Sequence, residues 1–205
     1  NKVQFDLAAF YMKIDNQKLS QMAGNYGFGR MMTNAGKSMS CGVETSMRGL
    51  AIDDHLSWML SYGYTHAALD EYTDTVMVNG TKTLVDYEDN KVPFVPEHNF
   101  AASLDYRFDL ANMGLLRSIT VGANVNGQGK TYWDEANTVS QKLYAVVGAH
   151  LAFDLGKAKI NVWGRNLTDS RYNVFAVSSG ATGKTNWFGQ RGNPLQIGAD
   201  LKIHF

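Results

Sequence analysis

The last nine residues alternate between an apolar side chain and one suited to water, and the chain ends on an aromatic ring. The apolar positions are Ile197, Ala199, Leu201, Ile203 and Phe205, and between them lie Gly198, Asp200, Lys202 and His204. Successive side chains of a β-strand point to opposite faces, so this pattern predicts a strand with one apolar and one hydrated face. Such a strand suits a soluble sandwich as well as a barrel wall in lipid.

The composition favours strands over helices or disorder. The 205 residues include 20 Gly, 10 Tyr, 10 Phe and 4 Trp but only 3 Pro, a mixture typical of aromatic-rich strands. Lys plus Arg (19) balances Asp plus Glu (19), so we expect no nucleic-acid partner. Cys41 is the single cysteine, which excludes an intrachain disulfide and zinc sites built on Cys pairs. No apolar run approaches the ~18 residues of a spanning helix.

Nine segments have the character of strands, and several match the ~9–11 residues of a tilted membrane strand. We expect them at Val3–Ile14, Lys18–Ala23, Ser38–Leu50, Leu56–Thr65, His98–Phe108, Ser118–Asn126, Gln141–Phe153, Lys159–Leu167 and Leu195–Phe205. The alternation is clearest in the fourth, fifth and seventh segments. In the seventh, Leu143, Val147, Leu151 and Phe153 share one face, while Lys142, His150 and Asp154 share the other.

The connections between these segments alternate in length. Short links are predicted at residues 15–17, 51–55, 109–117 and 154–158, and long links at residues 24–37, 66–97, 127–140 and 168–194. Short periplasmic turns and long extracellular loops are typical of outer-membrane barrels. The sequence therefore predicts an all-β fold, an antiparallel up-and-down transmembrane β-barrel wall. Nine strands are an odd number and leave two open edges, which lipid does not tolerate. We therefore expect an incomplete wall.

Several stretches, in order along the chain, resemble the C-terminal barrel of TonB-dependent outer-membrane receptors. They are Asn34–Lys37 with Cys41–Glu44, Leu60–Thr65, Asp86–His98, Gly164–Tyr172 and Gly189–Pro194. In the third stretch Asp89 stands where the family usually has glycine. The resemblance covers essentially the whole chain.

The resemblance implies a barrel of about 22 strands with a plugged lumen. Residues 1–205 would then be the C-terminal part of the barrel, about nine strands, with the plug domain and the TonB contact upstream. It implies a protein of the bacterial outer membrane, in contact with lipid, that is not an enzyme and uses no cofactor. It also implies active import of a scarce nutrient, first a ferric siderophore or similar iron chelate, alternatively a carbohydrate or cobalamin. In this family the closing strand, here ending at Phe205, is the signal for the barrel-assembly machinery.

Loop aromatics are the best candidates for ligand contact. Tyr132, Trp133, Trp187 and Phe188 lie in long links, where a ligand would first stack. The chain offers no catalytic grouping, and its five histidines lack metal-ligand spacing, so we expect no metal site. Gly180–Thr185 resembles a phosphate loop, but Ser178 stands where its first glycine should be.

The polar positions of the predicted strands form an inward set that hydrates the lumen or contacts the plug. The set comprises Glu44, Arg48, Asp105, Arg107, Asn124, Asn126, Lys142, His150, Lys159, Asn161, Arg165, Asp200 and Lys202. Two other classes of protein remain open as alternatives. One is a small self-contained outer-membrane barrel, and the other is a soluble β-sandwich binding module. The odd strand count disfavours the first, and the regular alternation of link lengths disfavours the second.

Overall fold

The computed structural model describes residues 2–22, 30–78, 81–110, 114–179 and 186–204. These residues form fourteen β-strands: β1 (Lys2–Met22), β2 (Arg30–Ala51), β3 (Leu56–Glu71), β4 (Thr73–Val78), β5 (Thr81–Asp86), β6 (His98–Asp109), β7 (Ser118–Gln128), β8 (Thr131–Tyr132), β9 (Ser140–Gln141), β10 (Tyr144–Asp154), β11 (Ala158–Arg165), β12 (Asn173–Ser179), β13 (Asn186–Arg191) and β14 (Gln196–Ile203). In these ranges no helix is long and apolar enough to cross a membrane.

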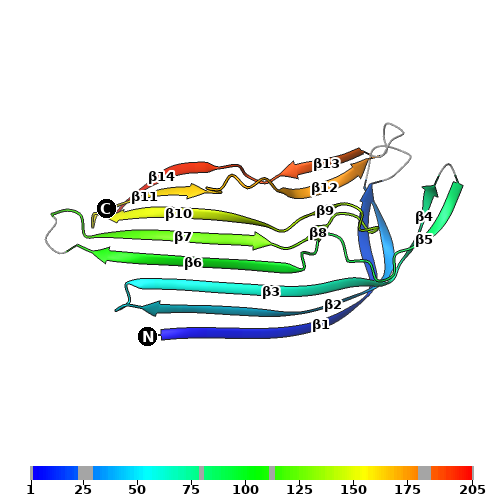
Figure 1. The fold of residues 1–205 in the computed structure, drawn as a ribbon, viewed down its shortest axis with the longest axis horizontal. Coiled ribbons are helices and arrows are strands. Elements are labelled where there is room, and N and C mark those ends of the chain that lie inside the picture. The colour runs from blue at the N-terminus through cyan, green and yellow to red at the C-terminus, as the bar shows by residue number, and fades with distance from the viewer. Residues whose placement is uncertain (1, 23–29, 79–80, 111–113, 180–185, 205) are drawn as a thin grey trace.

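Eight strands form one antiparallel sheet in the order β1-β2-β3-β6-β7-β10-β11-β14. The other six form three short ribbons, β4–β5, β8–β9 and β12–β13, inserted into the links of the sheet. Figure 1 shows the sheet as a single layer with these ribbons gathered at one end. The all-β, antiparallel, up-and-down prediction is confirmed, and a second sheet packed face to face, as a sandwich needs, is not found in the described ranges.

The sheet has eight strands where the sequence predicts nine, because the first two predicted strands are one. The predicted turn at residues 15–17 is wrong: β1 stays paired with β2 on both sides of Asn16, with Asp15 opposite Lys37 and Gln17 opposite Ala35. Asn16 has a φ of 56°. Asparagine enters this left-handed region more easily than most residues, so one irregular residue is accommodated without ending the strand.

The three later short links and the three later long links confirm the predicted alternation, whereas the predicted long link 24–37 is wrong in part, because β2 begins at Arg30 and residues 23–29 lie outside the described ranges. The short links are residues 52–55, 110–117 and 155–157. Each closes with a backbone hydrogen bond, from His55 to Ile52 (3.0 Å), from Leu110 to Arg117 (2.8 Å) and from Leu155 to Ala158 (2.8 Å). The long links carry the three ribbons. We call the end of the sheet that carries these ribbons the long-loop end, and the end that carries the short links the short-link end. Both termini lie at the short-link end (Figure 1), as an even number of strands requires.

Strand register places apolar and polar residues on opposite faces of the sheet. One row across β6, β7, β10, β11 and β14 reads Phe108, Ile119, Phe153, Ile160 and Leu201. The adjacent row, on the other face, reads Arg107, Thr120, Ala152, Asn161 and Asp200. We call these the outer and inner faces. The predicted inward residues of the strands fall on the inner face, whereas Lys142 lies between β9 and β10.

The buried hydrophobic cluster lies at the long-loop end, around the part of β3 that continues past its pairing with β6. It consists of Ala67, Leu69, Tyr72 and Val92, with Tyr87 and Val95 packed against it. Large apolar side chains of the outer face stay exposed, for example Leu60 (52%), Leu104 (51%) and Leu201 (64%). A face of this kind needs an apolar medium to cover it.

Candidate functional site

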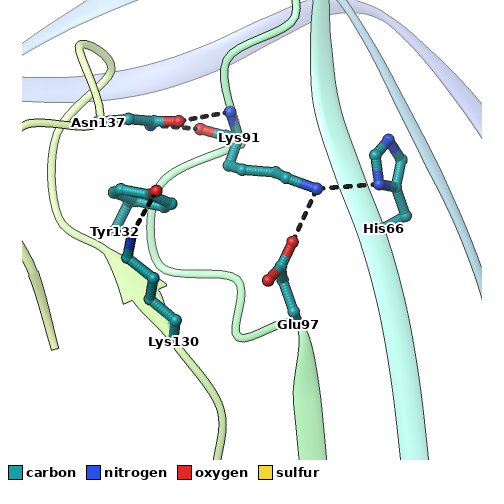
Figure 2. A network of polar contacts seen from close by, with 6 residues as sticks. All are labelled: His66, Lys91, Glu97, Lys130, Tyr132 and Asn137. Carbon is teal, nitrogen blue, oxygen red and sulfur yellow. Dashed lines mark hydrogen bonds and ion pairs between the residues drawn. The ribbon is translucent and has the colours of Figure 1, made fainter. Parts of the chain in front are cut away.

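A polar network ties three segments of the long-loop end together (Figure 2). The Lys91 Nζ lies 2.8 Å from Glu97 Oε1 and 2.9 Å from His66 Nδ1. Asn137 pairs with the backbone of Lys91 in both directions, accepting from its N–H (2.7 Å) and donating to its carbonyl (3.0 Å). The network therefore joins the long-loop end of β3, the link before β6 and the loop between β8 and β9.

The network has an electrostatic consequence for Glu97. The hydrogen bond from the Lys91 ammonium lowers the pKa of this carboxyl below its ordinary 4.5, burial opposes the change, and the charges of Lys91, His98 and His66 add to the lowering. The side chains of Lys91 and Glu97 are 25% and 31% exposed. The pair is thus partly shielded from solvent, which strengthens it relative to a fully exposed pair.

Tyr132 and Trp133, two of the predicted ligand residues, lie in or beside β8. Lys130 donates a hydrogen bond to the Tyr132 hydroxyl (2.6 Å) and stands 4.2 Å from the centre of its ring. The Trp133 ring packs against Phe94, with 5.5 Å between the ring centres. Both residues therefore help to hold the loops together, and Trp133 lies in an aromatic cluster.

The other two predicted ligand residues lie apart from the first two, on strand β13. Trp187 is opposite Ser178 and Phe188 is opposite Val177, so the two rings project to opposite faces of the β12–β13 ribbon. Phe188 is 59% exposed and Trp187 is 36% exposed. Ring contacts within the described ranges include Trp133 but neither of these two residues. Phe205, the predicted assembly signal, lies outside the described residues.

Two of the aromatic contacts at this end that the sequence does not predict are stacked pairs. Phe94 stacks on Phe175 of β12, with 5.8 Å between ring centres and 14° between ring planes. Tyr144 of β10 stacks on Tyr172, at 4.1 Å and 11°. The pairs join residues at least 28 positions apart, counting from Tyr144 to Tyr172, so local pattern carries no sign of them. The one local signal is the Pro93–Phe94 pair, which is typical of a turn.

A hollow of about 800 Å³ lies on the inner face below the long-loop end. Its lining includes Asp6, Glu44, Asn126, Tyr144 and Tyr172. The lining is polar and aromatic, and within it the Ser46 hydroxyl donates to Asp6 Oδ2 (3.4 Å). Among the described residues no group of three or more His, Cys, Asp or Glu is placed to hold a metal ion.

An inner-face contact between His150 and Asp105 links β6 to β10 across β7. His150 Nε2 lies 3.4 Å from Asp105 Oδ1, and Gly122 stands between them in the register. A Cβ on Gly122 would collide with both side chains. The glycine therefore gives the pair its space. On the neighbouring strand, the indole N–H of Trp163 in β11 donates to Asp200 of β14 (2.8 Å). The Arg165 guanidinium lies over the Trp163 ring, 4.6 Å from its centre.

Comparison with known proteins supports one family throughout. The chain is 26% identical over 183 residues to the pesticin receptor of Yersinia pestis and 25% identical over 181 residues to that of Yersinia enterocolitica, covering 88% of this chain in both cases. The chain spans about a quarter (24%) of the length of these relatives.

Solved structures share the fold. The ferric yersiniabactin uptake receptor FyuA from Yersinia pestis superposes with a TM-score of 0.76 at 23% identity, covering 99% of this chain and 28% of that one. The siderophore receptor PiuA from Acinetobacter baumannii gives a TM-score of 0.68 at 20% identity, covering 98% and 26%. The family model described as "TonB dependent receptor-like, beta-barrel" matches residues 1–167. The chain therefore belongs to the TonB-dependent receptor family and forms part of its β-barrel.

Proposed function

We propose that this chain is part of the barrel of a TonB-dependent transporter that imports a ferric siderophore or a similar iron chelate. The family is one of bacterial outer-membrane receptors and not of enzymes. The observation that carries the iron assignment is the likeness to receptors named for ferric yersiniabactin, siderophore and ferric citrate transport. The open, polar inner face beside long loops suits a transport lumen.

The proposed orientation follows from the two faces and the two ends. The outer face, with its exposed Leu60, Leu104 and Leu201, contacts lipid, and the inner face lines the lumen. The long-loop end is extracellular and the short-link end is periplasmic, because outer-membrane barrels have long outer loops and short inner turns.

The proposal also names the residues that contact the ligand and the proteins that bind the receptor. Ligand contact is assigned to the loop aromatics Tyr132, Trp133, Trp187 and Phe188. TonB engages a part of the receptor upstream of this chain, and the barrel-assembly machinery recognises the last strand through Phe205. Residues 1–205 supply the wall, so uptake requires the plug that we place upstream.

Uptake of radioactive iron tests the function. Cells expressing the full-length receptor should accumulate ⁵⁹Fe from ferric chelates when TonB is present and should not do so in a tonB deletion strain. Competition with cobalamin or an oligosaccharide should leave iron uptake unchanged. TonB-dependent uptake of cobalamin or sugar without any uptake of iron would assign the receptor to the alternative ligand class.

A further inference from the structure

Phe94 occupies a backbone position that usually belongs to glycine. Pro93 and Phe94 form a turn, and Phe94 has a φ of 67°. With proline at the second position, a positive φ at the third is the mark of a type II turn, where glycine or asparagine is preferred. A bulky aromatic residue in this region is a genuine outlier, and such outliers cluster at ligand clamps and other functional sites.

The strained residue places its ring where three loops meet. Phe94 packs on Phe175 of β12 and on Trp133 beside β8, while its backbone N–H donates to the carbonyl of Tyr132 (2.8 Å). Phe94 is nevertheless 45% exposed. We call Phe94, Trp133 and Phe175 the Phe94 platform. The platform is held on two sides yet presents an open aromatic surface.

The β12–β13 ribbon extends this surface in one direction. Phe175 and Val177 lie two residues apart on β12 and so share a face, and Phe188 stands opposite Val177. Phe188, which is 59% exposed, therefore lies on the same face of the ribbon as Phe175. Trp187 lies on the other face and does not extend the platform.

The charge around the platform disfavours a highly anionic ligand. The segments that carry Phe94 and Trp133, residues 87–97 and 129–141, contain five carboxylates and two lysines, and the β12–β13 ribbon adds Arg191 and no carboxylate, so carboxylates outnumber cations by five to three. The carboxylates are Glu88, Asp89, Glu97, Asp134 and Glu135; Glu97 is paired with Lys91, and Asp134 accepts from Thr138 and Val139. The two lysines are already engaged, Lys91 by Glu97 and His66, and Lys130 by Tyr132. Flat rings stack on such a surface by dispersion and quadrupole attraction without needing a cation.

We propose that the Phe94 platform binds a planar aromatic ring of the transported iron chelate and so selects aryl chelates of low charge over polycarboxylate chelates. This inference rests on the proposed function and adds the ligand class. Phe94 and Phe175 become ligand residues, and the strain at Phe94 is explained because glycine would relax the turn but remove the ring.

Two synthetic chelates that differ in their arms test the proposal. In the ferric complex of N,N′-bis(2-hydroxybenzyl)ethylenediamine-N,N′-diacetate (HBED), two phenolate arms replace two carboxylate arms of ferric EDTA, and both complexes carry the same charge. Calorimetry on the purified full-length receptor should give about three- to tenfold tighter binding of ferric HBED, the range that aromatic pairs contribute. Equal affinity for the two, or no binding of ferric HBED, would overturn the platform.

Variants separate ring binding from loop packing. Phe94→Leu keeps an apolar side chain and should lose the preference for ferric HBED, whereas Phe94→Tyr should keep it. Val174→Ala removes an exposed apolar side chain beside Phe175 and should leave both affinities unchanged. If Phe94→Leu lowers both affinities equally, Phe94 only packs the loops and the proposal is wrong. TonB-dependent iron uptake by the wild-type receptor, measured separately, reports on the proposed function alone.

Discussion

Single residues of β10 should differ sharply in their tolerance of charge. Val147 lies on the outer face and Val146 on the inner face, where it lines the hollow. In the full-length receptor, Val147→Lys should destabilise the barrel by up to about 2–4 kcal/mol, the cost of lysine on a lipid face near the bilayer midplane. Val146→Lys, the matched control one residue away, should cost far less because the lumen is hydrated. Urea unfolding in lipid vesicles measures both, and equal losses would mean that Val147 does not face lipid.

Two inner-face glycines should respond differently to alanine. At Gly122 the new Cβ meets the flexible ends of Asp105 and His150, a pair exposed enough to be worth no more than about 1 kcal/mol. At Gly198 it meets the indole of Trp163, which Asp200 and Arg165 hold in place. Overpacking a fixed ring costs about 1–3 kcal/mol. Gly198→Ala should therefore lower the unfolding free energy more than Gly122→Ala, and the reverse order would refute this account.

At the scale of whole strands, the alternation of apolar and polar residues predicts which face each residue occupies better than it predicts where the strand ends. The faces of β6 and β10 follow from the sequence because every second residue is apolar, and the register then confirms them. Asp15, Asn16 and Gln17 have the composition of a turn, so the sequence predicts two strands where the structure has β1 alone. Pairing with β2 on both sides of Asn16 outweighs that local preference, and such pairing is a tertiary effect that composition does not contain.

The loops at the long-loop end were less predictable than the strands. Trp133 was identified as a ligand candidate because it is an aromatic residue in a long link. Phe94 and Phe175 were not, because their contact depends on how two loops fold over one another. The prediction of a long link at residues 66–97 did not include the continuation of β3 to Glu71 or the β4–β5 ribbon. The Thr and Val residues of this stretch, which favour strands, give a weak signal for such a ribbon.

The network around Lys91 should make the order of these loops depend on pH. The pKa of Glu97 is lowered, so its contribution to stability is present above the ordinary value of 4.5 and is lost as pH falls below 4.5 through the lowered pKa. Amide protection factors from hydrogen exchange across residues 87–97 should therefore drop in that acidic window. Glu97→Gln should give lower protection at neutral pH and no further drop between pH 4.5 and 3. A variant that matched the wild type at every pH would show that the ion pair does not order the link.

For the whole molecule, what stands out is how little of the sheet is covered by the chain itself. The main buried cluster, around Leu69 and Tyr72, lies at the long-loop end, where β3 continues past its pairing with β6, and most of both sheet faces stays open. The outer face suits lipid and the inner face suits water or another polar surface. A single-layer wall of this kind gains its stability from closing into a barrel, because closure removes unpaired edges.

The two edges of the sheet lead to the last prediction. Within the described residues β1 and β14 each pair on one side only, and their lengths differ greatly, 21 residues against 8. Unpaired backbone groups cost several kcal/mol each in lipid, and strands so unequal cannot close on one another along the whole of β1. Residues 1–205 expressed alone and refolded into detergent or vesicles should therefore oligomerise or remain sensitive to protease, whereas the full-length receptor should give a protease-resistant monomer with heat-dependent mobility on gels. A resistant, heat-modifiable monomer of the isolated segment would instead mean that β1 and β14 close an eight-stranded barrel, and that the hypothesis of a small self-contained barrel is correct.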